Sequence, residues 1–323
     1  MKRKRIRKKL STFFANVFSL MVTPLFVIST KLPRLIIIFL GELFADLFWK
    51  IGIPWKKMAI NNLMLVYRDT LTKKELRKIA KVSMKNIFRM FWEGPIIYKP
   101  PYTLIKSTPI EGEEYLTRAL EQGNGVLALG NHIGHFPLLL CVLTGKGYPV
   151  SFVYKEPKNQ SVRRLTTKIM KDLHLDTIPL KPRHVVIKRS LETLRKNGIL
   201  WIALDQNARG GGEIGVEFFG KKVATAKGPA VLSMRTGAVV IPFYAKRNGW
   251  FKHTVVIEEP VILDSTDNRE QDAYTNTLKF NAIIERLILK NPTEWWWVHN
   301  RWKKAQRYVE EDVTESDISQ DND

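Results

Sequence analysis

Cysteine is nearly absent from this chain of 323 residues, because Cys141 is its only one. A single cysteine excludes a disulfide framework and any zinc or iron–sulfur site built from cysteines. The sequence also lacks the Gly-x-Ser-x-Gly turn of a serine nucleophile, and its glycine-rich stretch at residues 209–213 lacks the Lys-Ser/Thr of a phosphate-binding loop. We therefore expect no covalent intermediate on serine or cysteine, no metal site and no bound cofactor.

Long uncharged apolar stretches are missing from all but the first fifth of the sequence, which excludes a multi-span membrane protein. Within that fifth, residues 11–30 carry no charged side chain and, as a helix rising about 1.5 Å per residue, would reach across the hydrocarbon core of a bilayer. A second apolar stretch, residues 35–49, is interrupted by Glu42 and Asp46 and is typical of an interfacial helix. We predict a membrane anchor. The alternative is a cleaved signal peptide, although no small-x-small cleavage site follows the stretch.

The orientation of this anchor follows from the charge before it. Seven of the first ten residues are basic, which predicts a cytoplasmic amino terminus. If residues 11–30 span the membrane, the rest of the chain lies on the opposite side, unless residues 35–49 bring the chain back to the cytoplasmic side. An embedded or re-entrant segment is therefore favoured over a single span, with the body of the protein on the cytoplasmic face.

Acidic residues are scarce, with 31 Asp and Glu against 52 Lys and Arg and a formal net charge of +21. The seven acidic residues of the tail, residues 309–323, balance the seven basic residues of the amino terminus, so residues 11–308 carry the whole excess. Such a body suits nucleic acid, an anionic membrane surface, or an acidic substrate or carrier. The acidic tail is typical of a disordered segment.

Between the two ends, short β-rich runs alternate with helical patterns, which predicts an α/β fold: a mostly parallel or mixed central sheet flanked by helices, with the membrane-embedded helix at the amino terminus. The predicted strands cover residues 125–130, 149–154, 199–204, 238–244 and 254–258. The predicted helices cover residues 72–90, 136–143, 160–173, 183–196, 227–235 and 273–290. We divide the chain into a basic, membrane-embedded segment (1–55), one α/β domain (56–308) and the acidic tail (309–323).

A candidate site follows the first predicted strand, where residues 131–138 read NHIGHFPL. Ligands of α/β sheets bind at the carboxyl ends of strands, and the neutral imidazole of His132 could take a proton from an alcohol there. Gly134 would let a substrate approach the backbone, and Pro137 suits the first turn of a helix. Alternatively, these are loop histidines bonded to carbonyl groups, and for His135 that alternative is favoured.

Residues 131–138 also resemble the His-x-Gly-Asn-Trp-Glu block of bacterial lipid A biosynthesis acyltransferases, the lauroyl and myristoyl transferases of the lysophospholipid acyltransferase-like superfamily. Four further blocks are similar to this family and follow in the same order. They are residues 204–206, 216–230, 235–242 and 295–303, the last of which reads WWWVHNRWK. The resemblance covers roughly residues 10–308.

The chain departs from the family at one position. The acid of the family's His-x4-Asp/Glu motif falls at Pro137, which cannot orient an imidazole or accept a proton. Three interpretations stay open. Asp205 could orient His132 instead, His135 could act as a second imidazole, or the protein could have lost activity and bind lipid without turnover.

The resemblance implies a membrane-associated acyltransferase that moves a fatty acyl chain from a thioester donor to a hydroxyl of a glycolipid, a lipid A precursor, with His132 as general base. It implies acyl carrier protein as donor, with coenzyme A as the alternative, and the inner (cytoplasmic) membrane as location, with the catalytic domain on the cytoplasmic face. A lysophospholipid or another glycolipid could replace the acceptor, a silent lipid-binding protein is the alternative function, and nucleic acid is not an expected partner. Predicted catalytic residues are His132, Asp205 and His135. Predicted substrate-binding residues are Asn131, Gly134, Arg163, Arg164, Gln206, Lys221 and Lys227. Each basic one taken singly is better explained as a solvated surface charge, whereas the set of them around the family blocks favours binding.

Overall fold

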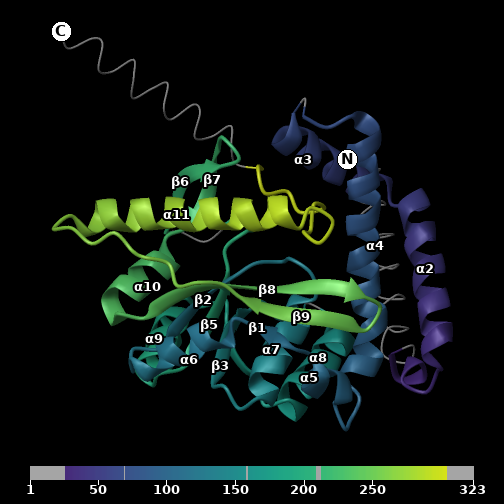
Figure 1. Ribbon diagram of the computed structural model, residues 1–323, viewed down its shortest axis with the longest axis horizontal. Helices are drawn as coiled ribbons and strands as arrows, with labels where there is room; N and C mark the ends of the chain where they lie inside the picture. The colour runs from purple at the N-terminus through teal and green to yellow at the C-terminus, as the bar shows by residue number, and fades with distance from the viewer. Residues whose placement is uncertain (1–25, 69, 158, 209–211, 304–323) are drawn as a thin grey trace, which may run out of the picture.

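A seven-stranded sheet forms the centre of the molecule (Figure 1). It belongs to a computed structural model that describes residues 26–68, 70–157, 159–208 and 212–303. The strand order is β1-β9-β8-β2-β5-β3-β4, in which β8 and β9 are antiparallel and every other neighbouring pair is parallel. Its strands are β1 (Ile110–Glu111), β2 (Val126–Gly130), β3 (Val150–Tyr154), β4 (Asp176–Pro179), β5 (Ile199–Ala203), β8 (Val239–Gly249) and β9 (Lys252–Ile257). The predicted α/β fold with a mostly parallel sheet is confirmed.

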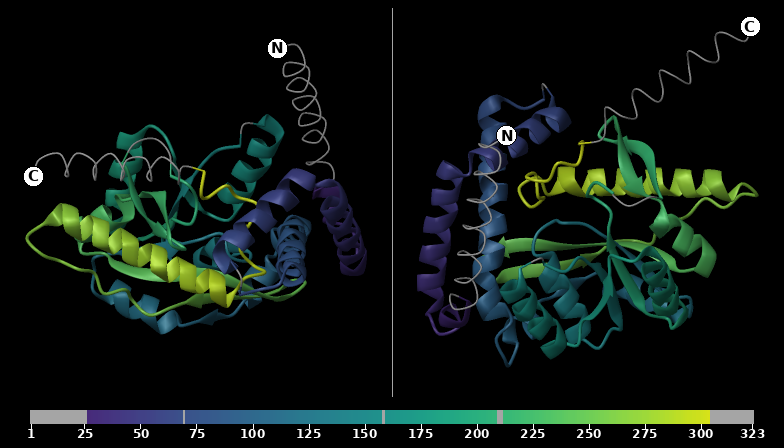
Figure 2. Two further views of the ribbon diagram at one scale, coloured as in Figure 1. Left: turned by 90° about the horizontal axis from the view of Figure 1, so that it is seen from above. Right: turned by 180° about the vertical axis from the view of Figure 1, so that it is seen from behind.

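Helices cover both faces of this sheet, and α11 lies across one of them (Figures 1 and 2). The carboxy-terminal helices are α9 (Arg183–Arg195), α10 (Gly228–Thr236) and α11 (Arg269–Lys290). The helices of the middle of the chain are α5 (Thr103–Ser107), α6 (Glu113–Glu121), α7 (Phe136–Gly145) and α8 (Gln160–Asp172). A separate antiparallel hairpin, β6 (Glu213–Phe218) and β7 (Lys221–Ala226), packs beside α11.

The central strand β2 shows why the sequence folds in layers. Each of its residues is buried, as expected for a strand covered on both faces. Leu127 and Leu129 join the hydrophobic cluster that includes α9, α10 and α11, whereas Val126 and Ala128 join the cluster that includes α6 and α7. Because side chains alternate along a strand, one short apolar run supplies both halves of the core.

Three helices precede the sheet: α2 (Arg34–Ile51), α3 (Ile53–Tyr67) and α4 (Lys73–Ile97). A capping box formed by Thr72 and Glu75 begins α4. Helices α2 and α4 lie side by side at one end of the molecule, where Glu42 of α2 pairs with Lys85 and Arg89 of α4 (Figures 1 and 2). The two acidic residues that interrupt the apolar stretch are thus used to join α2 to α4, since Asp46 also pairs with Lys85.

The predicted amino-terminal membrane helix falls largely on residues that the structure does not describe. Most of residues 11–30 lies outside the described residues, as does the acidic tail 309–323. Within residues 26–303, as far as they are described, no helix combines the length and the apolar character needed to cross a bilayer.

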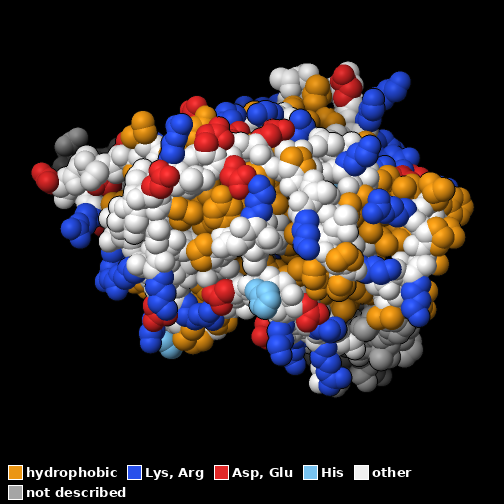
Figure 3. Space-filling model, turned by 60° about the horizontal axis from the view of Figure 1, so that its bottom comes forward, with side chains coloured by type: hydrophobic (Ala, Val, Ile, Leu, Met, Phe, Trp, Pro, Cys, Tyr) orange, Lys and Arg blue, Asp and Glu red, His pale blue; other side chains and the backbone are white. Residues whose placement is uncertain are grey.

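The second apolar stretch, residues 35–49, falls inside α2. One side of this helix is buried against the body and the other side is exposed and strongly apolar. The exposed side chains are Leu35, Ile36, Phe39, Leu43, Phe44 and Leu47. Figure 3 shows hydrophobic side chains gathered at the end of the molecule where α2 lies. An exposed apolar surface of this extent marks an interaction site for a protein or a membrane.

Candidate active site

Two neighbouring parallel strands bring the candidate acid and base together. Gly130 of β2 lies opposite Ala203 of β5 at the carboxyl ends of these strands. His132 follows β2 by two residues and Asp205 follows β5 by two residues, so both side chains reach the same edge of the sheet. There His132 Nδ1 lies 2.8 Å from Asp205 Oδ1, and the main-chain N–H of His132 donates to Asp205 Oδ2 at 3.0 Å.

Asp205 is held as an ionised carboxylate. Its side chain is 1% exposed, and the indole N–H of Trp295 donates to Oδ2 at 2.7 Å. Burial by itself raises the pKa of Asp205, but the charge and hydrogen bonds of His132 and the hydrogen bond from Trp295 lower it to about 2. An ionised carboxylate can only accept hydrogen bonds, so the proton of the neutral imidazole lies on Nδ1 and Nε2 carries the free lone pair.

That lone pair faces Gln206. The side-chain nitrogen Nε2 of Gln206 lies 3.2 Å from His132 Nε2, and with Nδ1 protonated this amide N–H is the donor. The His132 side chain is 16% exposed, and Gln206 is half-buried. A hydroxyl group that reaches this edge of the sheet can therefore take the place of the amide at Nε2.

Aromatic rings surround the imidazole on its other sides. The ring centroids of Phe136, Trp296 and Trp201 lie 4.6, 5.4 and 6.5 Å from that of His132. Phe136 also stacks on Trp201, with 7° between the ring planes. Pro137 stands in the first turn of α7, where its missing N–H costs no helical hydrogen bond. The carboxylate beside the imidazole thus comes from β5 and not from the motif position in α7.

His135 lies in a different environment. It is 1% exposed, and its Nδ1 accepts a hydrogen bond from Leu138 N at 3.2 Å, which caps α7. Its ring packs edge-on against His253, with 5.2 Å between the centroids. Burial lowers the pKa of His135 to about 3, so its imidazole is neutral. In the structure His135 positions the helix that follows the loop and does not join His132 and Asp205.

Comparison with known proteins identifies the family. The family model for bacterial lipid A biosynthesis acyltransferase matches residues 3–304. The chain belongs to this family. It is 25% identical over 287 residues to the lipid A biosynthesis palmitoleoyltransferase of Escherichia coli (strain K12), which covers 84% of this chain and 87% of that protein. It is 26% identical over 284 residues to a lipid A biosynthesis acyltransferase of Haemophilus influenzae (84% and 86% covered), and 23% identical over 250 residues to the lipid A biosynthesis lauroyltransferase of Escherichia coli (76% and 78% covered). The predicted family and the assignment as an acyltransferase are confirmed.

Two of the predicted substrate-binding residues of this acyltransferase, Asn131 and Gly134, stabilise the loop that carries His132. The side chain of Asn131 is buried, donates to Phe243 O at 3.1 Å and accepts from Ile133 N at 3.2 Å. Gly134 has φ +60°, and a Cβ placed on it would lie 1.7 Å from Ala245 O. Both residues hold the turn that carries His132 close against β8. Gly134 thus permits the close approach of the β8 backbone, where the sequence predicted the approach of a substrate.

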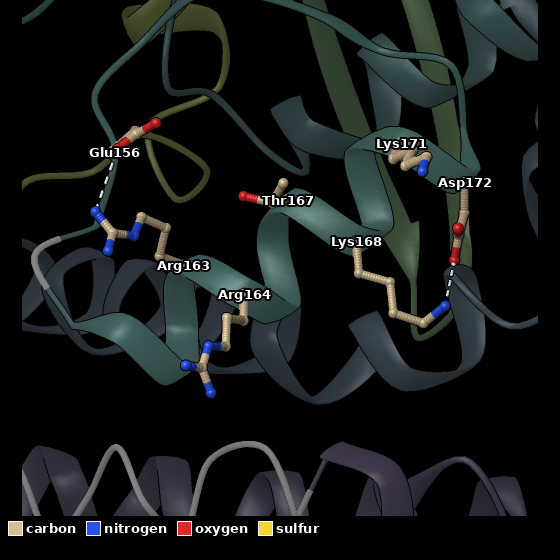
Figure 4. Close-up of a pocket in the computed structure, with 7 residues that line it drawn as sticks. All are labelled: Glu156, Arg163, Arg164, Thr167, Lys168, Lys171 and Asp172. Atoms are coloured by element: carbon tan, nitrogen blue, oxygen red, sulfur yellow. Dashed lines mark hydrogen bonds and ion pairs between the residues drawn. The ribbon is translucent and has the colours of Figure 1, made fainter.

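The predicted basic residues lie on other surfaces. Arg163 and Arg164 are exposed on α8, and Arg163 approaches Glu156 at 3.6 Å. They line a shallow groove of about 630 Å³ (Figure 4). The other residues that line it are Glu156, Thr167, Lys168, Lys171 and Asp172. On the hairpin side, Lys221 begins β7 and is exposed, and Lys227 lies at the start of α10, 3.8 Å from Glu270.

Two residues of the site were not predicted: Trp295, which bonds to Asp205, and Arg301. The guanidinium of Arg301 is fully buried and donates to Gln206 O at 3.0 Å. Both residues belong to the carboxy-terminal block 295–303, whose resemblance to the family was the available signal. The local sequence does not indicate that this block packs at the ends of β2 and β5. Arg301, for example, is more than ninety residues away from Asp205 in the sequence.

A second buried cluster lies behind the loop of the acyltransferase. Glu93 of α4 pairs with Arg247 of β8 at 2.7 Å and lies 3.3 Å from His253 of β9, and Arg247 Nε lies 4.0 Å from Glu294 Oε2. The carbonyl of Glu294 accepts from Gly134 N at 3.1 Å, which joins the cluster to the loop. Burial raises the pKa of Glu93, but His253 and Arg247 lower it to about 2, whereas burial raises the pKa of Glu294 to about 7.

Substituting Gly134→Ala tests the tight approach of the loop to β8. The new methyl group meets the Ala245 carbonyl and adds to the cost of a positive φ, so we expect a melting temperature several degrees lower and loss of most activity. Gly123→Ala is the matched control, because Gly123 has φ +77° but open space around its Cβ position. Equal effects of the two substitutions on thermal melting and turnover would contradict this account.

The raised pKa of Glu294 gives a pH dependence of stability with a definite sign. Between the ordinary value of 4.5 and about 7, the unfolded chain releases the proton and the folded chain keeps it, so stability falls as pH rises through this window. Glu294→Gln keeps the acceptor for Asn86 and removes the titration. We expect the variant to melt at a higher temperature than wild type at pH 8, with a gain of up to about 3 kcal/mol, and at the same temperature below pH 4.5. Melting curves at both pH values, with the surface substitution Glu121→Gln as control, check this; a gain that is independent of pH would refute it.

Proposed function

We propose that this acyltransferase moves a fatty acyl chain from a thioester, that of acyl carrier protein, to a hydroxyl group of a lipid A precursor, and that His132 is the general base. The observation that carries the proposal is the pair of hydrogen bonds between Asp205 and His132, because an ionised Asp205 on Nδ1 leaves the Nε2 lone pair free for a proton. The family's reaction, acyl transfer in lipid A biosynthesis, agrees with this chemistry.

The reaction then proceeds without an acyl-enzyme. His132 Nε2 removes the proton of the acceptor hydroxyl, and the oxygen attacks the thioester carbonyl carbon to form a C–O bond. The tetrahedral oxyanion collapses, the C–S bond breaks, and the imidazolium returns its proton to the leaving thiolate. The amide N–H of Gln206, displaced from His132 by the hydroxyl, is a suitable donor to the oxyanion.

The rings of Phe136 and Trp296 support the choice of acyl transfer over hydrolysis. They cover the imidazole with apolar surface, which limits the access of water to a bound thioester. The acceptor hydroxyl is then the nucleophile that meets the base.

Basic surfaces are suited to the two anionic substrates. The groove on α8 presents Arg163, Arg164, Lys168 and Lys171, with Glu156 and Asp172 beside them, and suits an acidic carrier protein or the phosphate of its thioester arm. Lys221 and Lys227 suit a phosphorylated glycolipid. Coenzyme A as donor, or a lysophospholipid or other glycolipid as acceptor, would use the same chemistry and is distinguished by the products.

The apolar side of α2 supports an embedded amino terminus at the inner membrane, with the catalytic domain on the cytoplasmic face. Leu35, Phe39 and Leu43 are 79%, 66% and 52% exposed, and burying such side chains in the acyl region of a bilayer is favourable. This surface would place the active-site domain next to its lipid acceptor.

Removing either member of the acid–base pair tests the mechanism. In Asp205→Asn the amide N–H₂ would donate to Nδ1 and move the imidazole proton to Nε2, so we expect turnover to fall by roughly 10⁴-fold while the protein stays folded. His132→Ala should abolish turnover. Mass spectrometry of lipid A from a deletion strain that carries each gene, with His184→Ala and Asp267→Asn as surface controls, should show one acyl chain missing in the two active-site variants alone. No difference in lipid A between the strains that carry wild type and His132→Ala would point to the silent lipid-binding alternative or to another base.

Contact of α2 with the bilayer is testable because the chain has one cysteine. Burial raises the pKa of Cys141 to about 12, so a thiol-reactive dye leaves it unlabelled and reports a cysteine introduced by Phe39→Cys. We expect a blue shift of an environment-sensitive dye at position 39 when vesicles of phosphatidylethanolamine and phosphatidylglycerol are added. Ile262→Cys is the matched control, since Ile262 is also apolar and 85% exposed but lies in the loop after β9. The same response at both positions would withdraw this support for membrane contact.

A further inference from the structure

Arg301 is a buried cation whose hydrogen bonds, within the described chain, go to neutral groups. Its side chain is 0% exposed. Nη1 donates to Gln206 O at 3.0 Å and to Ala224 O at 2.6 Å, and Nη2 donates to Thr225 Oγ1 at 2.7 Å. Its Nε has no hydrogen-bond partner among the described residues. Burial of a charge in this way is costly unless an opposite charge lies close by.

The buried charge of Arg247 is arranged differently. Arg247 is also buried, but it pairs directly with Glu93 at 2.7 Å. For Arg301, by contrast, the face of the Phe218 ring lies 4.9 Å from the guanidinium carbon, and the carboxylate that acts on its charge is that of Asp205. Burial lowers the pKa of Arg301 to about 10, while the charge of Asp205 raises it, so the guanidinium stays ionised at neutral pH.

Gln206 connects this cation to the general base. Its carbonyl is held by Arg301 and its side-chain amide lies 3.2 Å from His132 Nε2. One residue, Gln206, therefore links Arg301 to the imidazole, and it contacts the Nε2 side of the ring while Asp205 contacts the Nδ1 side. The fork of Arg301 also fixes β7 through Ala224 and Thr225, so the hairpin and Gln206 have a common support.

The charges of this centre balance when the imidazole is neutral, since Asp205 is negative and Arg301 is positive. The other groups in contact with these three residues are neutral: the rings of Phe136, Trp201 and Trp296 around His132, the indole of Trp295 on Asp205, and the hydroxyl and carbonyl groups of β7 on Arg301. In a site of low dielectric constant, a fixed positive charge disfavours a second positive charge on the imidazole. Direct binding of an anionic substrate by Arg301 is excluded by its complete burial.

We infer that Arg301 is a positioning residue whose buried charge opposes a second positive charge on His132 and whose fork holds Gln206 against His132. The inference rests on the proposed role of His132 as general base. When His132 takes the proton of the acceptor, the oxyanion that forms supplies the opposite charge, so Arg301 opposes protonation of the resting base more than protonation during turnover.

The test is the pH profile of kcat/KM, which reports the ionisation of the free enzyme. The full chain is assayed in detergent micelles between pH 5 and pH 9 with acyl-carrier-protein thioester and lipid A precursor. In Arg301→Met the imidazolium loses its repulsion, so we expect the acidic limb to move to higher pH by about one unit. Arg301→Lys keeps the charge and should return the acidic limb to its wild-type pH. Its rate should stay lower, because lysine cannot make the forked hydrogen bonds of the guanidinium. Thr225→Val removes one hydrogen bond of Arg301 without a change of charge and should leave the limb in place.

The outcomes separate the possible roles. If thermal melting shows that Arg301→Met does not fold, the pH profile of Arg301→Gln is measured instead. Its side chain is neutral, and its amide can still donate to a carbonyl group. An unmoved limb in the folded neutral variant would overturn the inference and leave Arg301 as a structural residue. An equal shift in Arg301→Lys would also overturn it, since geometry and not charge would then be responsible. If His132→Ala keeps wild-type turnover, the proposed function fails and the inference fails with it; if His132→Ala is inactive and the limb does not move, the inference alone fails.

Discussion

The hydrogen bonds between His132 and Asp205 depend on the parallel register of β2 and β5 and on the burial of the carboxylate. A carboxylate in this apolar surrounding would be protonated without partners, and it is kept ionised by the imidazole, an indole and a main-chain amide. Those three donors come from two distant parts of the chain, the loop after β2 and the carboxy-terminal segment. The loop, the sheet and the carboxy-terminal segment therefore have to pack together before Asp205 is held ionised beside His132.

Two sets of buried charges are connected to the loop that carries His132. Asp205 bonds to His132 and Arg301 holds Gln206, whereas Glu93 and Arg247 reach the loop through Glu294, whose carbonyl accepts from Gly134 N. The loop itself is held by neutral contacts, the amide of Asn131 and the close approach of Gly134 to β8. His135 belongs to this supporting side, since it caps α7 and packs on His253. A loop held in this way suits the proposed role of His132, because a general base has to meet a hydroxyl in one orientation.

Much of this architecture was predictable from local sequence, because buried parallel strands are continuous apolar runs and the covering helices are amphipathic. β2 and β5 were predicted to within a residue, and α8 and α9 likewise. The strands that were not predicted are short or polar: β1 has two residues, β4 begins with an exposed Asp176, and the β6–β7 hairpin lies outside the main sheet. Asp205 could be predicted as the partner of His132, because it follows a predicted strand, as His132 does, and lies in the family block of residues 204–206. Arg301 and Trp295 could not, since their roles depend on where a distant segment packs.

Pro137 has a consequence for how activity depends on folding. In the family's His-x4-Asp/Glu motif, base and acid are neighbours within a single turn, so a locally formed loop already contains both. Here the two partners are 73 residues apart in the chain, and Trp295 is a further 90 residues beyond Asp205. A partly folded chain with an intact loop thus holds an unpaired imidazole. The separation makes the proposed catalytic pair a property of the complete sheet, and it couples the acquisition of the pair to long-range contacts that form slowly compared with local ones.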